Sequence, residues 1–569
     1  MSPDTTRVAG MTSMPMPTAA FEDDQYPSGT AISEAIDNFF RHVHYIPVFS
    51  FLHQASIVER HRAGDLEAPL ALAIVGLTAL MLGMSDDLEQ LSPRYIDVAE
   101  DLIVKDRESP SVWKVQALIL IIKYRAASRQ FTAVFMLIAI AVRFATALRL
   151  NYEDQKMPFL AREECRRAMW SVYMIDTVLA GGYQDFTLCP EEILHIQLPS
   201  HDRNYKLDIP QTTQDLHRMT ARAAEPDLGS LALVIRMMSL RQKVLQFTKR
   251  AAVSSPPGLE ISIHSLQKEL DGYVLQLPAA FHFTDKNARL HACATSLPAF
   301  VTVHMTLLGT HYILYRLFIK GLKEALPDAV LGQLDPDFIR SCHQHCLQGV
   351  RRMIEIFRIL PTLTSQPTIL DADMAVTVYQ SSEMLDGVWV SQGFLSTMFF
   401  ECEAVRFIRR DLAELINRGG SRPITPDPDN LGMGTGTQDQ VLISPADKAP
   451  HILSRHSFIG QMHAASKNRI QTRLSTRTAL SSRTGTQTRG GASGGAREPL
   501  RAHDQISSIP TPIPQNSTGI TTSGYGDEDA MNSSLFPSLP DLGLLQFEGD
   551  SSIWLPNSLF DTHDGSLLQ

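Results

Sequence analysis

The aromatic residues of this 569-residue chain stop almost entirely at residue 418. The chain has 42 Phe, Tyr and Trp residues, and 36 of them precede residue 419. The rest of the chain keeps six, and none of these lies between residues 459 and 524. A segment so poor in large apolar side chains cannot bury enough surface to offset its conformational entropy. We therefore predict a disordered N-terminus at residues 1–30, a folded region at residues 31–418 and a long disordered C-terminal tail.

The folded region is predicted to be all-α, a large multi-helix domain. Apolar residues recur in it at spacings of three and four, whereas alternating strand patterns are scarce. Its longest apolar blocks are residues 68–84, 113–150 and 301–322. A membrane span requires about 20 apolar residues. Pro69 interrupts the first block, and Lys123 and Arg143 interrupt the second, so buried helices are favoured over the alternative of a membrane protein.

Charge, cysteine content and motifs exclude several classes of protein. A net charge of −10 argues against nucleic-acid binding by the overall charge of the chain. Six cysteines without a CxxC pair are typical of a protein in a reducing compartment inside the cell. No phosphate-binding glycine loop, GxSxG or HExxH motif occurs in a suitable context. We expect no catalytic residues, no cofactor-binding residues and no enzymatic activity.

Two groups of potential metal ligands are interpreted as structural. Residues 342–346 read Cys-His-Gln-His-Cys, but helical spacing places both cysteines on the apolar face and turns the two histidines away from each other. The histidines at 42, 44 and 53 have no cysteine or acidic partner nearby in the sequence, and we expect a packed loop there. We therefore predict no metal-binding residues.

The stretch at residues 162–176, REECRRAMWSVYMID, is the most distinctive helix. Helical spacing allows Glu163 to pair with Arg166 and Arg167, and Glu164 to pair with Arg167. An acid–base role for Glu164 would require a second polar group and a cleft, and the sequence indicates neither. We interpret these charges as structural.

This stretch resembles the E-x-R-R-x-x-W-x-x-Y-x-x-D signature of the fungal-specific transcription factor domain, the middle homology region of fungal zinc-cluster transcription factors. The matching signature residues are Glu164, Arg166, Arg167, Trp170, Tyr173 and Asp176. Weaker blocks resemble the family in the expected order at residues 39–53, 113–151, 198–199 and 311–319. The resemblance covers residues 35–410 and implies an all-α regulatory domain.

The resemblance also implies a nuclear transcriptional regulator from a fungus. Its partners would be transcription coactivators, a DNA-bound partner or a second copy of the chain, and a small-molecule effector, with no membrane. Family members usually begin with a six-cysteine binuclear zinc cluster, whereas the first cysteine here is Cys165. Zinc is therefore expected only if an N-terminal cluster is missing from the gene model. Otherwise the protein acts through a DNA-bound partner, or it competes for a partner of full-length relatives.

The tail divides into two segments of opposite charge. Residues 419–524 are expected to be a disordered linker that contains a basic Ser/Thr-rich tract, in which residues 448–501 hold ten Lys or Arg and one acid. Residues 525–569 hold eight acids and no Lys or Arg, with apolar residues between prolines. This composition predicts an acidic activation segment that folds on binding a coactivator. The residues expected to carry activation are Phe547, Trp554, Leu555 and Phe560.

Two functional hypotheses remain from the sequence. The favoured one is a transcriptional regulator of a nutrient-use or secondary-metabolite gene cluster, as the resemblance implies. The alternative is an α-helical small-molecule-binding protein or enzyme without a known motif. That alternative predicts a pocket in which polar groups converge and pKa values are strongly shifted.

Overall fold

A computed structural model of the chain describes residues 26–216, 228–253, 258–320, 325–364, 369–382 and 388–417. All of them fall within one compact unit. The predicted segments at residues 419–524 and 525–569, and most of residues 1–30, lie outside the described residues. The predictions of disorder and activation for these segments therefore remain predictions.

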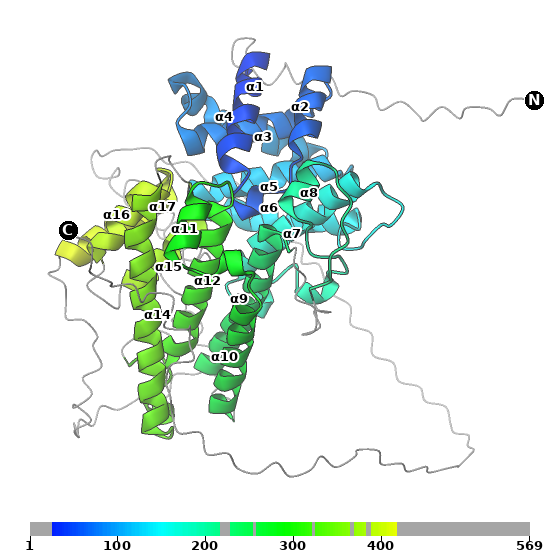
Figure 1. Cartoon of the computed structure of the whole chain (residues 1–569). Helices are drawn as coiled ribbons and strands as arrows, with labels where there is room; N and C mark the ends of the chain where they lie inside the picture. Colours follow the sequence, from blue (N-terminus) through cyan, green and yellow to red (C-terminus); the bar gives the residue numbers. More distant parts are fainter. Residues whose placement is uncertain are drawn as a thin grey trace, which may run out of the picture. The chain divides into compact units, whose positions relative to one another are not determined.

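The described residues form helices and contain no strand, which confirms the predicted all-α class (Figure 1). The α-helices of the first half are α1 Gly29–Asn38, α2 Gln54–Ala63, α3 Ala68–Leu82, α4 Asp86–Lys105, α5 Val112–Ala127, α6 Phe131–Ala147, α7 Phe159–Ala180 and α8 Asp202–Lys206. Those of the second half are α9 Ser230–Val253, α10 Leu259–Leu275, α11 Asp285–Ala292, α12 Leu297–Tyr315, α13 Asp328–Leu331, α14 Pro336–Leu363, α15 Ala375–Ser382, α16 Val388–Met398 and α17 Glu403–Asn417. Short turns include the π-helix η2 Phe39–Val43 and the 3-10 helices η3 Pro47–Phe49, η4 Gln184–Phe186, η5 Glu191–Ile193, η6 Ala279–Phe281, η7 Arg316–Phe318 and η8 Ala372–Met374.

Helices α3 and α5 form the core of the first half. Both helices are apolar on almost all sides. Helix α3 packs against α1, α4 and α5, so little of its surface is exposed to water. Gly76 lets α4 approach α3 closely, since a Cβ atom there would lie only 2.8 Å from the Ile96 side chain. Ser92 of α4 donates a hydrogen bond of 2.9 Å to the Gly76 carbonyl at this crossing.

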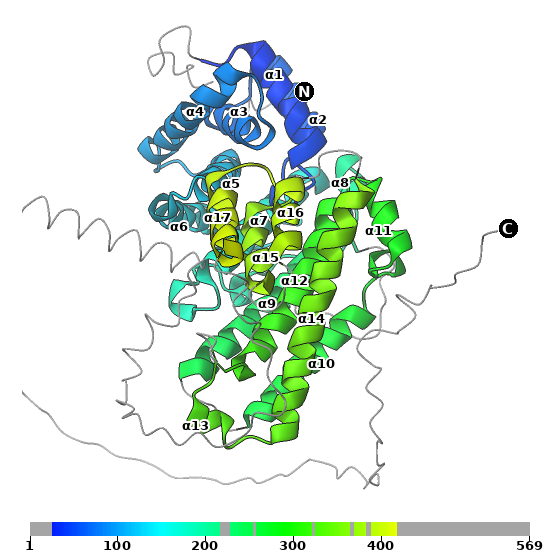
Figure 2. The same ribbon diagram turned by 90° about the vertical axis from the view of Figure 1, so that its left-hand side faces the viewer.

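Helix α12 is the central helix of the second half, between α9 and α14. Within the described residues, Leu297–Phe318 has the length and hydropathy of a membrane-spanning helix. Helices α2 and α3 reach that length and hydropathy only when they are taken together, and the two are bent by 120° relative to each other. In Leu297–Phe318, 83% of the apolar window is buried inside the protein, as expected for a core helix. Figure 2 shows α14 running alongside α12, with α10 beside the lower part of α14 in this view.

The two halves of the sequence meet in the middle of the unit. Helix α7 packs against α5 and α6 on one side and against α9 on the other. The C-terminal helix α17 returns to contact α5, so residues about 290 positions apart in the sequence lie side by side (Figure 2). This return brings η8 and α15 to the inner face of α5 and α7, where a cavity lies.

Candidate functional site

The structure places all six signature residues on α7. The carboxylate of Glu163, the residue before them, is completely buried and accepts hydrogen bonds from Arg166 Nη1, from Arg167 Nε at 2.8 Å and from the Ser200 backbone N–H at 2.8 Å. The expected pairs of Glu163 with both arginines therefore form. The expected pair of Glu164 with Arg167 does not form, because the Arg167 guanidinium turns towards Glu163 and the loop beyond α7.

The two arginines join α7 to the loops on either side of it. Arg166 forms a forked pair with Glu153, at 2.7 and 3.0 Å. Arg167 donates to the carbonyls of Ser50 at 3.0 Å and Ser200 at 2.7 Å. Because every contact is made to the chain itself, this buried network fixes loop positions and leaves no guanidinium group available to a ligand.

The remaining signature side chains also hold loops. Trp170 donates from Nε1 to the Gln197 carbonyl at 2.8 Å, and the Tyr173 ring packs edge-on against the indole at 5.5 Å. Asp176 accepts the backbone N–H groups of Leu188 and Cys189 at 3.0 and 2.8 Å. Burial raises the pKa of Asp176 to about 6, although these two hydrogen bonds favour its ionised form.

Glu164 lies apart from this network and has no hydrogen bond or ion pair among the described residues. Burial raises the pKa of its carboxyl to about 7, and the positive charge of Arg60 opposes the rise only in part. Between pH 4.5 and about 7, the Glu164 carboxyl is therefore mostly protonated in the folded protein and mostly ionised in the unfolded chain.

This raised pKa predicts a pH-dependent effect of Glu164→Gln. Below pH 4.5 the glutamate is protonated in both states, and the variant should match the wild type. Between pH 4.5 and 7 the wild type loses stability relative to the variant, and above pH 7 the variant should be more stable by about 1–2 kcal/mol. Urea unfolding of both proteins from pH 4 to 8 measures this difference. A difference that does not change with pH would contradict the raised pKa.

The Cys-His-Gln-His-Cys segment lies on α14, with Cys342 and Cys346 buried. His343 contacts the Phe318 carbonyl at 2.7 Å, whereas the His345 ring stacks on Tyr315 at 5.1 Å. The histidines thus point to different partners. Throughout the part of the chain that the structure describes, no three His, Cys, Asp or Glu residues are close enough to hold a metal ion.

The histidines of the first block do not converge either. His53 caps α2, and its Nδ1 accepts the Ser56 backbone N–H at 3.3 Å. His44 is partly buried, and its Nδ1 has no hydrogen-bond partner among the described residues. Burial, assisted by the positive charge of Arg167, lowers the pKa of His44 to about 4, so the ring is neutral at pH 7. His44 and His53 line a cavity of about 630 Å³, together with Arg203, Lys206 and Arg167, and the buried Arg167 is already paired.

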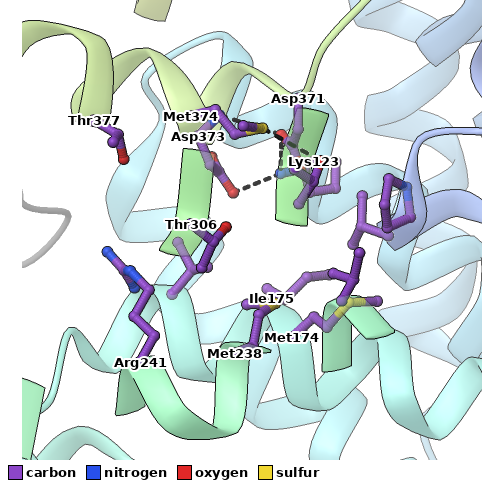
Figure 3. Close-up of a pocket in the computed structure, with 15 residues that line it drawn as sticks. Lys123, Met174, Ile175, Met238, Arg241, Thr306, Asp371, Asp373, Met374 and Thr377 are labelled. Atoms are coloured by element: carbon purple, nitrogen blue, oxygen red, sulfur yellow. Dashed lines mark hydrogen bonds and ion pairs between the residues drawn. The ribbon is translucent and has the colours of Figure 1, made fainter. Parts of the chain in front are cut away.

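A second cavity, of about 90 Å³, lies where the two halves of the sequence meet (Figure 3). Residues of η3, α5, α7, α9, α12, η8 and α15 line it. Lys123 of α5 donates to Asp371 Oδ1 at 2.7 Å and to Asp373 Oδ2 at 2.6 Å. Burial by itself would lower the pKa of Lys123, but the two carboxylates outweigh it and raise the pKa above its ordinary value. The ammonium group is therefore permanently charged at neutral pH.

Arg241 of α9 is the other cation of this cavity, and it makes no hydrogen bond or ion pair with any described residue. Figure 3 shows it on the side of the cavity away from Lys123. Burial lowers its pKa to about 10, and the negative charge of Asp373 opposes this fall only in part. The apolar wall is formed by Val178, Val234 and Met238 together with Met174 and Ile175 of α7.

The sequence alone did not single out this cavity. One signal was available: Lys123 is a lone cation inside the run ALILIIKY at residues 117–124, and a buried charge requires a partner. The partners, Asp371 and Asp373, are about 250 residues away, so their identity depends on the tertiary fold.

Residues 36–258 match the profile of the fungal specific transcription factor domain. The matched region covers less than half of the chain. It contains α7 with all six signature residues, and it also contains Lys123 and Arg241. The matched region thus supplies both cations of the cavity, while the carboxylates come from beyond the matched residues.

Three similar proteins are named as transcription factors or as a transcriptional regulatory protein. The chain is similar to the Zn(2)-C6 fungal-type transcription factor FTF1c of Fusarium oxysporum f. sp. lycopersici, with 21% identity over 362 residues, which is 58% of this chain and 38% of the relative. Similarity to FTF1a of the same organism is 21% over 363 residues, 58% and 33% of the two chains. An uncharacterized transcriptional regulatory protein, C1327.01c of Schizosaccharomyces pombe, is 24% identical over 230 residues, 36% and 23% of the two chains.

The chain spans less than two fifths of the length of these relatives. No solved structure matches it.

Proposed function

We propose that this protein is a nuclear transcriptional regulator that controls a nutrient-use or secondary-metabolite gene cluster and is not an enzyme. The observation that carries this proposal is the match of residues 36–258 to a transcription factor domain, with the six signature residues in one buried helix. The buried charges of α7 support a non-catalytic role, because the hydrogen bonds of Glu163, Arg166 and Arg167 hold neighbouring loops in place. The helical domain then serves as a rigid surface for regulatory partners, with zinc expected only from an N-terminal cluster outside this sequence.

Two measurements test the location and the targets. A fluorescent fusion of the full chain should accumulate in the nucleus of the source organism. Deletion of the gene should change the transcripts of a group of adjacent genes rather than scattered ones. A cytoplasmic fusion, or a deletion strain with an unchanged set of transcripts, would contradict the proposal.

The C-terminal residues 525–569 are proposed to recruit coactivators. Their eight acids repel one another and keep the interspersed apolar side chains in water, while three prolines prevent a stable core. Apolar groups held in water in this way are available to dock in the groove of a partner.

Alanine replacement of the four large apolar residues tests this recruitment. With residues 525–569 fused to a foreign DNA-binding domain, the wild-type segment should activate a reporter, and the set Phe547→Ala, Trp554→Ala, Leu555→Ala and Phe560→Ala should abolish activation. As the matched control, replacing the acids Asp541, Glu548, Asp550 and Asp561 by Asn or Gln should weaken it less, because docking is mainly apolar. An inactive wild-type segment, or an unaffected aromatic variant, would overturn the activation role.

A further inference from the structure

The cavity of about 630 Å³ beside α8 has the size of a ligand pocket. Its walls come from the segment between η2 and α2, from α7 and α8, from the start of α9, and from η6, α11 and α12. Pockets that hold small organic molecules measure about 300–1,000 Å³. This cavity is therefore large enough for such a molecule, whereas the cavity of about 90 Å³ beside Lys123 is not.

The charged side chains that line this cavity leave an excess of positive charge. Arg167 and Asp202 pair with each other at 3.1 Å, so their charges cancel. Arg203 and Lys206 of α8 are exposed, and their side chains form no ion pair with a described residue. Among the described residues of the wall there is no further carboxylate. Although the whole chain has a net charge of −10, the charges of this cavity favour a ligand that carries a negative group.

His44 adds an unpaired polar group to the same cavity. Its ring forms no hydrogen bond with a described residue, whereas His53 and His291, which also line the cavity, bond to the chain through both ring nitrogens. A neutral imidazole has one N–H donor, which a carboxylate can accept. The charge of Lys206 contributes to the low pKa of His44, so the ammonium group lies within electrostatic range of the ring. Donors from two elements thus converge.

The inner wall of the cavity is apolar. Leu52, Leu231 and Ala299 line it with buried side chains, and Phe281 is half-buried. Contact with these side chains removes apolar surface of a ligand from water. A closed cavity of about 150 Å³ holds benzene, which has six heavy atoms. By this measure, 630 Å³ accommodates a molecule of roughly 10–20 heavy atoms.

The positions of the charged and the apolar groups give the ligand an orientation. The cations of α8 are exposed at the mouth, and the leucines are buried inside. We propose that this cavity binds a carboxylic acid with an apolar body of roughly 10–20 heavy atoms, with the carboxylate at Arg203, Lys206 and His44. This site goes beyond the proposed function, because binding by the purified chain does not depend on nuclear location, target genes or residues 525–569. The two can therefore fail independently.

Calorimetric titration of the full chain with 2-naphthoate tests the proposal. This acid of 13 heavy atoms should bind with a Kd on the order of 10–100 μM. The neutral 2-naphthamide has the same shape and should bind at least tenfold more weakly, and 0.5 M salt should weaken the binding of 2-naphthoate alone. Equal affinities for the acid and the amide would overturn the proposal. So would the absence of 2-naphthoate binding at 1 mM, which is also the result expected if the acidic segment 525–569 occupies the cavity.

A double variant of α8 connects binding to the cavity. Arg203→Gln with Lys206→Gln should keep the helical circular dichroism, because no described ion pair is lost. It should weaken 2-naphthoate at least tenfold and leave 2-naphthamide unchanged. Lys268→Gln with Arg351→Gln is the matched control, because it also removes two exposed positive charges, from α10 and α14 outside the cavity. Equal binding of 2-naphthoate by the two double variants would overturn the assignment.

His44→Phe tests the inner end of the polar site. The replacement removes no described hydrogen bond and keeps an aromatic ring beside Phe40, whose centroid lies 5.1 Å from that of His44. The thermal midpoint should therefore not fall, while 2-naphthoate should bind about fivefold more weakly because one donor to the carboxylate is lost. Unchanged affinity in this variant would overturn the role of His44.

Discussion

Replacement of Glu163 by alanine is expected to destabilise the helical domain by about 3–5 kcal/mol. The side chain of Glu163 is completely buried and accepts hydrogen bonds from Arg166, Arg167 and the Ser200 backbone. Its removal leaves two guanidinium groups and one N–H each short of one acceptor in a buried site. Arg166 keeps its pair with Glu153 and Arg167 keeps its pair with Asp202, but water does not replace the lost carboxylate, and such a loss costs far more than the pair contributes relative to apolar residues.

Urea unfolding followed by helical circular dichroism measures this effect. Glu164→Gln, one residue further along α7, is the matched control, because Glu164 has no partner among the described residues and its replacement should not destabilise. Limited proteolysis should also cut the Glu163→Ala variant faster near residues 197–202, the loop that Glu163 and Arg167 hold. A loss below about 1 kcal/mol would contradict a network role for Glu163.

Lys123→Met is the second substitution with a large expected effect, a loss of about 3 kcal/mol. The ammonium group neutralises Asp371 and Asp373 together, and it joins α5 to a segment about 250 residues later. Without it, the two carboxylates face each other in a partly buried site and repel. Because protonation relieves this repulsion, the loss should be larger at pH 8 than at pH 5.

A rescue and a control make this prediction specific. Adding Asp371→Asn and Asp373→Asn to Lys123→Met should recover most of the stability, since the amides do not repel each other. Lys105→Met removes an exposed pair with Asp101 and should cost less than about 0.5 kcal/mol. Thermal unfolding of all four proteins tests the set. Failure of the asparagine variants to recover stability would show that Lys123 acts by packing rather than by charge.

Local sequence features predicted the elements of this fold. The apolar blocks became the buried helices α3, α5 and α12, because an apolar surface on all sides of a helix has no stable place except the interior. The pairs of Glu163 with Arg166 and Arg167 followed from helical spacing. Spacing could not decide between Glu163 and Glu164 as partner of Arg167, because the loop at Ser200, which orients the guanidinium group, is 33 residues away.

By itself, the sequence determined the all-α class and the resemblance of its first part to a transcription factor domain, since these depend on periodicity and on a motif within one helix. Only the tertiary structure decided the cavity. Lys123, Arg241 and the pair Asp371 and Asp373 lie on three separate elements, α5, α9 and η8 with its cap, and nothing in the neighbourhood of any one element specifies the others. Which charge finds a partner, and which remains unpaired like Arg241, depends on how whole helices pack. That packing is set by the total buried surface of the domain rather than by any local pattern.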